Sequence, residues 1–286
     1  MACEIAADGV IAGRLAPSGE MLEACTSAAL SPGCVVPDLT DQNLRDRDAV
    51  QQKIRDALGT LAGRSRDVIA VLPDAAVRVM LLDFETLPTR REEAESVIRF
   101  RLKKSLPFDV DSAKVSYQAQ PTEAGMRVIA AVALKSVVED YEAAFRDAGF
   151  TAGVVMPSML AALGAAQEDA PTLVVKLDAR TTSIAILNKQ QLLLFRTLEN
   201  ALGTEITGEQ LAEEVYPSVV FFQDTYSLNI DHIFVSGLPE SGGAAPALAA
   251  QTGAQVQELV SFDKLGASSG PLPRWRMSGV AGALLS

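Results

Sequence analysis

The stretch VIAVLPDAAVRVMLLDFETLPTRREEAESVIRFRLKKSLPFDVDSAKVSYQAQ, residues 68–120, decides the organisation of this chain. It opens with two apolar runs, residues 68–72 and 77–84, which are rich in Val and Leu and typical of strands. The dipeptide Pro73-Asp74 between them indicates a turn. The segment therefore predicts two short strands that follow one another closely.

A helix is expected to follow from Thr89, which stands three residues before Glu92 in the spacing of a capping box. Acidic residues fall in its early turns and basic residues in its late turns, an arrangement that suits the helix dipole. Pro107 ends the helix, and residues 114–120 then alternate like a short strand. The apolar stripe of the helix consists of Ala94, Val97, Ile98 and Leu102.

Composition limits the class of protein. The chain has 286 residues, of which 48% are hydrophobic and 21% charged, enough for one large or two medium globular domains. Its net charge of -11 argues against binding to nucleic acid, which needs phosphate neutralisation by Lys and Arg, and is most simply explained by solubility. Three cysteines without a CxxC pair, together with a single histidine, indicate reduced thiols in a cytosolic protein and no metal site. The N-terminus does not read as a signal peptide, and no apolar run of 18 residues predicts a membrane span.

The rest of the first half continues to alternate strands and helices. Residues 3–15 read as a hairpin around the turn dipeptide Asp8-Gly9. Ser136 and Glu139 have the spacing of a second capping box, which predicts the start of another helix after a strand.

The second half begins near Pro171 and repeats the pattern. Thr207 and Gln210 begin a long helix that reaches about Tyr226. Pro217 inside this helix predicts a kink or a break into two pieces. The strands expected before the helix are residues 173–177, 183–187 and 191–197. Taken alone, the residues predict an α/β protein of two lobes, each with a hairpin-led sheet and helices.

The order of these elements resembles the PilM family of cytoplasmic actin-like proteins of type IV pilus assembly. The strand pair, the Glu-rich helix with its basic end, the Pro107-Phe108 pair, the acidic turn and the next strand carry the resemblance, which covers most of the chain. It implies a two-lobed actin-like α/β fold. The first lobe is expected over residues 1–170, with an inserted small α+β module at about 75–150, and the second lobe over residues 171–286.

Members of that family carry a lid subdomain in the second lobe, between the hairpin strands and the long helix. Here only about ten residues separate Thr197 from Thr207, whereas even a small independent unit needs ~40 residues. We therefore expect the lid to be reduced or missing.

Actin-like ATPases hold phosphates on two hairpins of the pattern Asp-x-Gly followed by Ser or Thr, because glycine lets the backbone amides approach the phosphates closely. In this chain residues 4–6 (Glu-Ile-Ala) and 178–180 (Asp-Ala-Arg) stand at the matching places, so both glycines are replaced. We therefore expect no cofactor and no metal, with ATP and magnesium as the disfavoured alternative. The degenerate nucleotide site that the resemblance implies consists of Asp178, Thr181, Thr182, Ser236 and Gly237.

No catalytic residue is assigned. His232 is the only histidine and lies where a strand begins, which is typical of a hydrogen-bonded surface residue. No P-loop or Rossmann fingerprint is present. We therefore expect a protein that is not an enzyme, and the alternative is an active ATPase of the PilM family.

The resemblance leaves binding as the expected function. In the PilM family, the N-terminal cytoplasmic peptide of the membrane protein PilN docks in a groove beside the inserted module. The chain is therefore expected to be a cytoplasmic adaptor, recruited to the inner membrane through a PilN-like protein, with the pilus motor ATPase as a further candidate partner. Simple complementation of the helix dipole explains the basic residues equally well. The expected partner surface comprises Arg99, Arg101, Lys103, Lys104, Leu106, Pro107 and Phe108.

A second alternative is the cytoplasmic domain of a type II secretion GspL protein, which is also actin-like. GspL continues into a membrane helix, and none follows before Ser286, which favours the PilM family.

Overall fold

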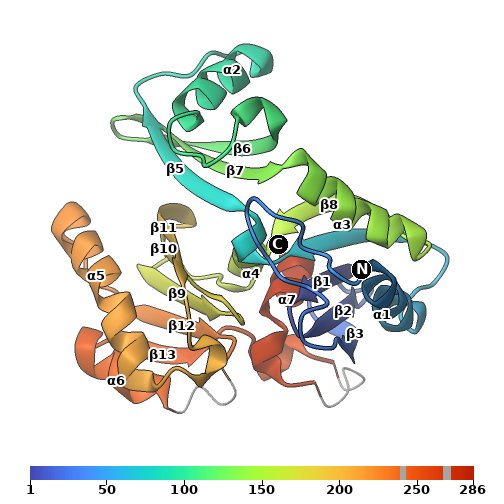
Figure 1. Ribbon diagram of the computed structural model, residues 1–286. Helices are drawn as coiled ribbons and strands as arrows, with labels where there is room; N and C mark the ends of the chain where they lie inside the picture. The colour runs from blue at the N-terminus through green and yellow to red at the C-terminus, as the bar shows by residue number, and fades with distance from the viewer. Residues whose placement is uncertain (239–242, 267–271) are drawn as a thin grey trace.

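The computed structural model describes residues 1–238, 243–266 and 272–286. Within these ranges the chain forms two five-stranded sheets and one three-stranded sheet, with helices packed on all of them. Figure 1 shows two lobes that carry the large sheets, and a module with the small sheet that projects from the first lobe. Among the described residues, no helix has both the length and the apolar character to cross a bilayer.

The two large sheets share one topology, with strand orders β3-β2-β1-β4-β8 and β11-β10-β9-β12-β13. In each sheet the first three strands form an antiparallel meander, and two further strands extend it in parallel. The strands of the first sheet are β1 (Ala2–Ala6), β2 (Gly9–Leu15), β3 (Leu22–Ala29), β4 (Asp67–Leu72) and β8 (Thr151–Pro157). Those of the second are β9 (Thr172–Leu177), β10 (Thr181–Asn188), β11 (Gln191–Glu199), β12 (His232–Ser236) and β13 (Gln255–Glu258). The duplicated layout predicted from the sequence is therefore present.

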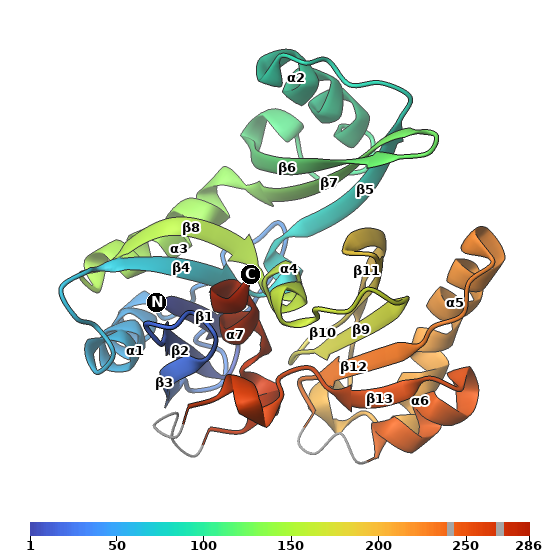
Figure 2. The same ribbon diagram turned by 180° about the vertical axis from the view of Figure 1, so that it is seen from behind.

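Helices cover both faces of the first sheet. On one face, α1 (Arg47–Gly59) and α3 (Lys135–Asp147) bury apolar side chains such as Ile54 and Phe145 in one core with Ile5 of β1. On the other face, the C-terminal helix α7 (Ser278–Leu285) packs against β1, β2 and β4. Figure 2 shows the chain returning from the second lobe to the first to form α7.

The second lobe has α5 (Gly208–Tyr226) and α6 (Ala244–Thr252) on one face of its sheet. The other face meets α4 (Ser158–Ala162), whose Met159 lies in one core with Val174 and Ala185. Since α4 also packs against α7 and β8, it joins the cores of the two lobes. Residues 200–207 connect β11 to α5 with a single 3-10 turn, so no lid subdomain stands there.

The module consists of β5 (Arg78–Phe84), β6 (Ala113–Thr122) and β7 (Gly125–Leu134), in the antiparallel order β5-β7-β6, with α2 (Arg91–Leu102) on one face. It also contacts the second lobe. The side-chain amide of Gln120 donates to the carbonyl oxygen of Leu192 at 2.9 Å, and Arg127 donates to the hydroxyl of Tyr226 at 2.9 Å. The module is therefore joined to the first lobe at one end of its sheet, where β5 begins and β7 ends, and contacts the second lobe at the other end, near the β6–β7 hairpin.

The predicted capping box of Thr89 and Glu92 is wrong. Helix α2 begins at Arg91, and its N-cap residue Arg90 makes no side-chain capping bond. Because the helix starts later than predicted, Thr89 lies outside the position from which a hydroxyl reaches the first free amides.

The predicted box of Ser136 and Glu139 is also wrong. Strand β7 runs directly into α3, which begins at Lys135 with Leu134 as an N-cap residue without a side-chain bond. Continuity of the strand therefore sets the helix start, and Ser136 is already inside the first turn.

The helix predicted from Thr207 is present as α5, and its start carries a capping box. The amide of Gln210 donates to the hydroxyl of Thr207 at 3.2 Å, and the Thr207 amide donates back to the Gln210 side chain at 2.9 Å. Pro217 does not break this helix, which continues to Tyr226. Pro217 lies on the exposed face, where water can satisfy the carbonyl left without its donor.

Candidate functional site

The two lobes face each other through equivalent hairpins. The β1–β2 hairpin is closed by the pair Ala6 and Gly9, and the β9–β10 hairpin has the same two-residue form at its turn, residues 179–180. By this register Glu4 and Lys176 hold equivalent positions, since Glu4 pairs with Ile11 and Lys176 with Ser183. Asp178 is then equivalent to Ala6, two residues away from the match with Glu4 that the sequence motif suggested. An acid and a base therefore stand at matching places of the two lobes.

Glu4 and Lys176 meet Asp74, and we call these three residues the interlobe ion cluster. The ammonium of Lys176 lies 3.7 Å from Oε1 of Glu4 and 3.9 Å from Oδ2 of Asp74. All three side chains are at most 7% exposed. Lys176 belongs to the second lobe and both carboxylates belong to the first, so these ion pairs connect the two lobes.

Hydrogen bonds complete the cluster. The hydroxyl of Ser158 donates to Oε1 of Glu4. The hydroxyl of Ser183 donates to Oδ2 of Asp74 at 3.0 Å, and the amide of Met159 donates to its Oδ1 at 2.8 Å. Buried carboxylates are costly unless they are paired and hydrogen-bonded, and here both conditions are met.

The surroundings shift the pKa values of the cluster. Burial raises the pKa of Asp74 to about 6, although Lys176 opposes the shift. Burial works against the ammonium of Lys176, but the nearby carboxylates of Glu4, Asp74 and Asp178 outweigh it and hold its pKa above the ordinary value. One ammonium thus faces an excess of buried negative charge.

A cavity of about 240 Å³ lies beside the cluster, between the two hairpins. Of the residues expected to form a degenerate nucleotide site, Asp178 and Gly237 line this cavity, whereas Thr181, Thr182 and Ser236 do not. The hydroxyl of Thr182 instead accepts a hydrogen bond from Asn200 at 3.2 Å.

Three backbone amides on the second-lobe side of the site are already bonded within the chain. Oδ1 of Asp178 accepts the amides of Arg180 and Thr181, both at 2.8 Å. The amide of Gly237 donates to the carbonyl oxygen of Trp275 at 2.9 Å. Gly237 has a φ of +89°, and a Cβ there would overlap the carbonyl oxygen of Leu177, so chain packing explains this glycine.

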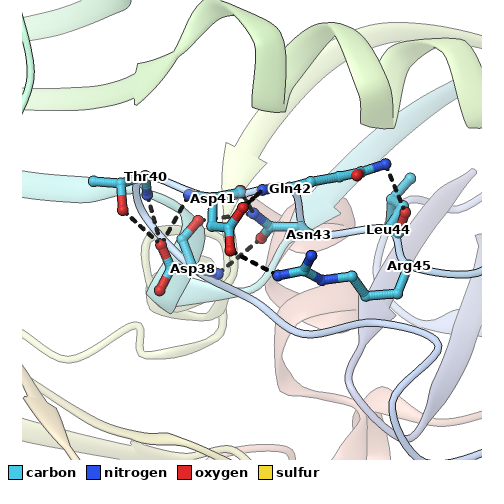
Figure 3. Close-up of polar contacts among 7 residues, drawn as sticks. All are labelled: Asp38, Thr40, Asp41, Gln42, Asn43, Leu44 and Arg45. Atoms are coloured by element: carbon cyan, nitrogen blue, oxygen red, sulfur yellow. Dashed lines mark hydrogen bonds and ion pairs between the residues drawn. The ribbon is translucent and has the colours of Figure 1, made fainter.

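A tightly bonded loop, residues 37–45, closes one side of the cavity with Pro37. Figure 3 shows Oδ1 of Asp38 accepting the amides of Thr40 at 2.7 Å and Asp41 at 2.9 Å, and these bonds hold the pKa of Asp38 below its ordinary value. Asn43 anchors the loop, since its side-chain oxygen accepts the amide of Asp38 at 3.0 Å and the buried hydroxyl of Tyr141 at 3.2 Å.

These residues do not fit a magnesium nucleotide. Volume does not decide this, because a second interlobe cavity of about 770 Å³ adjoins the first and shares Pro37, Ala179 and Arg180 with it. The amides of Arg180 and Gly237 are bonded internally, and the Lys176 ammonium lies between the acids that would face a metal ion. Among the described residues, no group of three His, Cys, Asp or Glu side chains has the placement for a metal ion.

A second concave site lies beside the module. It is a groove of about 440 Å³ between β6, the end strand of the small sheet, and β8, the end strand of the first large sheet. We call it the module groove. Its walls carry Arg99, Lys114, Lys135 and Glu142, and apolar residues line the rest: Leu72, Val77, Val115, Ala131, Ala133 and Val155.

Gly153 marks the β8 side of the module groove. The register of β4 and β8 shifts there: Val68 pairs with Ala152 and Ile69 with Val154, so Gly153 has no partner and forms a bulge. A Cβ at Gly153 would meet no atom within 4 Å. The sequence offered one signal for this site, a glycine inside an apolar strand, which often marks a close approach of another backbone.

The structure divides the predicted partner surface. Arg99 lines the module groove, where it donates to Glu95 at 2.8 Å and to the carbonyl oxygen of Val110 at 2.9 Å. Leu106 and Phe108 pack against the core of the module. Arg101 lies 5.8 Å from the ring centre of Phe84, and the exposed remainder is Lys103, Lys104 and Pro107.

Comparison with solved structures defines the fold class. A PilM-PilN type IV pilus biogenesis complex matches at 19% identity with a TM-score of 0.80, over 99% of this chain and 96% of that chain. A Bacteroides thetaiotaomicron protein with an actin-like ATPase fold matches at 11% identity and a TM-score of 0.55, over 89% and 88%. The cytoplasmic domain of EpsL, an inner-membrane component of the type II secretion system of Vibrio cholerae, matches at 10% identity with a TM-score of 0.58. The match covers 100% of this chain and 94% of that chain. The protein therefore has an actin-like fold, and that prediction is confirmed.

The sequence comparison is more specific. A family profile described as Type IV pilus assembly protein PilM matches residues 18–224. The chain belongs to this PilM family, as the resemblance in its sequence indicates. No curated protein matches it.

The interlobe ion cluster makes stability depend on pH in a defined direction. Asp74 binds its proton more tightly in the folded state, with a pKa of about 6, than in the unfolded chain, where the pKa is 3.8. The stability contributed by this proton is therefore complete below the unfolded pKa and is lost as pH rises through the folded pKa. As pH rises from about 4 to about 7, we expect the free energy of unfolding to fall less for Asp74→Asn than for the wild type. Denaturant unfolding at several pH values measures this, and a pH-independent difference between the two proteins contradicts it.

Proposed function

We propose that the chain is a non-catalytic adaptor of type IV pilus assembly that works in the cytoplasm and binds the N-terminal cytoplasmic peptide of a PilN-like inner-membrane protein. The peptide binds in the module groove, and membrane association arises only through that partner. The observation that carries the proposal is the apolar groove between two end strands. The pilus motor ATPase is a further candidate partner.

The groove suits an extended peptide. The end strands β6 and β8 each have one edge without a neighbouring strand in their sheets, and such an edge offers main-chain donors and acceptors to an added strand. The apolar lining offers pockets for alternate side chains of that strand. A matching structure that contains PilM together with PilN gives independent support for a partner of this kind.

The groove walls are already organised by charge pairs. Lys114 lies 3.0 Å from a carboxylate oxygen of Glu142, and Lys135 donates to the carbonyl oxygen of Asp111 at 2.8 Å. Arg99 is held by Glu95 at 2.8 Å. Because these side chains are fixed before a partner arrives, binding loses little of their conformational entropy.

The interlobe cleft supports the non-catalytic half of the proposal. The amides of Arg180 and Thr181 are bonded to Asp178, so these two donors of the second-lobe hairpin are not available to a phosphate. His232 lies at the first position of β12 and is only partly exposed. These bonded amides weigh against the ATPase alternative. The GspL alternative has less support than the PilM family, because the EpsL domain matches with a lower TM-score and the family profile is that of PilM.

Filling the groove should abolish peptide binding. Gly153→Phe places a bulky ring at a groove position where the fold leaves space, so we expect the dissociation constant of the N-terminal PilN-like peptide to rise at least about tenfold. Gly63→Phe is the matched control, since its Cβ also meets nothing within 4 Å but lies outside the groove. Titration calorimetry measures both, and equal affinities for the two variants would falsify the groove assignment.

The exposed lysines of α2 should matter less than the groove. Lys103 and Lys104 are exposed and do not line the groove, so the Lys103→Ala/Lys104→Ala variant loses only long-range attraction. We expect its dissociation constant to rise less than about fivefold, with a weaker dependence on salt. A loss as large as that of Gly153→Phe would move the site to the basic end of α2.

Nucleotide should leave the wild-type protein unchanged. A ligand present at 100 times its dissociation constant stabilises a folded protein by about 2.7 kcal/mol, which raises the melting temperature by several degrees. We expect millimolar ATP with magnesium to shift it by less than about 1 °C. A rise of several degrees in the melting temperature would contradict this prediction and favour the ATPase alternative.

A further inference from the structure

The acids of the interlobe ion cluster need a cation. Glu4 and Asp74 are buried in the first lobe, and their carboxylates converge on one point, the ammonium of Lys176. Two carboxylates at such a place are stable only with a positive charge between them, because each has lost its water. Lys176 supplies that charge from the opposite lobe.

Lys176 occupies an unusual place for a cation. It lies in β9, whose six residues are all buried, and at the strand position that Glu4 holds in β1. A lysine is rarely fully buried unless it is paired. Its neighbour across the hairpin, Ser183, donates to Asp74, so both strands of the second-lobe hairpin contact the first-lobe acids.

We propose that the ammonium of Lys176 is a built-in counter-ion that takes the place of a bound divalent cation between the lobes, so that the two lobes stay closed without nucleotide or metal. This goes beyond the proposed function, because none of the three cluster residues lines the module groove. The peptide titration and the test below can therefore fail independently.

The proposal has a direct consequence for a variant without the lysine. Lys176→Ala leaves two buried carboxylates uncompensated beside a vacated volume. Calcium accepts oxygen ligands in flexible geometry and completes its shell with water. The variant is therefore expected to gain a calcium dependence that the wild type lacks.

Thermal unfolding with and without calcium chloride tests this. We expect Lys176→Ala to melt about 10 °C below the wild type, because it breaks a buried pair. Millimolar calcium chloride should restore at least about half of that loss, and sodium chloride of equal ionic strength should not. The wild type should move by less than about 1 °C in either salt.

A second readout follows the site itself. Trp275 is the only tryptophan of the chain and lines the cavity beside the cluster. Calcium should change its fluorescence in Lys176→Ala and not in the wild type. A variant as stable as the wild type, or one that calcium neither stabilises nor perturbs at Trp275, overturns the proposal, as does a wild-type protein that calcium stabilises by several degrees.

A charge-neutral variant keeps the test decisive if Lys176→Ala does not fold. Glu4→Gln/Asp74→Asn/Lys176→Met removes all three charges together, so it should fold and melt above both Lys176→Met and Glu4→Gln/Asp74→Asn. If the triple variant is no more stable than Lys176→Met, charge compensation is not what the lysine provides, and the proposal fails.

Discussion

Charge removed from water at the contact of the two lobes must be compensated there, and much of the structure is arranged to do so. The ammonium of Lys176 comes from one lobe and the carboxylates of Glu4 and Asp74 from the other. Ser158, Ser183 and the amide of Met159 donate hydrogen bonds to the same two carboxylates. In a medium of low polarity such a set is strongly favoured when complete and costly when one member is missing, which makes the relative placement of the lobes specific.

The same requirement explains the small residues of the C-terminal helix. A Cβ at Gly279 would lie 2.5 Å from Oε2 of Glu4 and 2.8 Å from the hydroxyl of Ser158, and one at Gly282 would overlap the carbonyl oxygen of Ala161. Because these two positions lack a Cβ, the backbone of α7 can pack closely against Glu4 and against α4. The helix therefore covers Glu4 on the side of α7. A sequence of small apolar residues that reads only as a packed helix is here the cover of an ionic site.

Periodicity in the sequence was enough to predict most strands, most helices and the duplicated layout, because those depend on local pattern and on burial of one face. Strand β3 (Leu22–Ala29) was not placed, because residues 16–46 are rich in Pro, Gly, Ser and Asp. The start of α3 was not predictable in this way, since the continuity of β7 overrides the capping signal at Ser136. Glu4 was noticed as a changed motif residue, whereas Lys176 was not, although a single cation inside an apolar strand is a signal that a buried partner exists. The family resemblance implied a groove beside the module, but its lining residues were not predictable, because they come from two sheet edges, at β6 and β8, that meet only in the folded chain.

The buried charges and the groove are connected through one short segment. Leu72 lines the groove, Asp74 belongs to the ion cluster, Val77 lines the groove again, and β5 of the module begins at Arg78. With Asp74 held by Met159, Ser183 and Lys176, the base of the module has little freedom relative to β8. A groove whose two sides are fixed in this manner is formed before its peptide arrives, so an adaptor of this design needs no nucleotide cycle to become competent for binding.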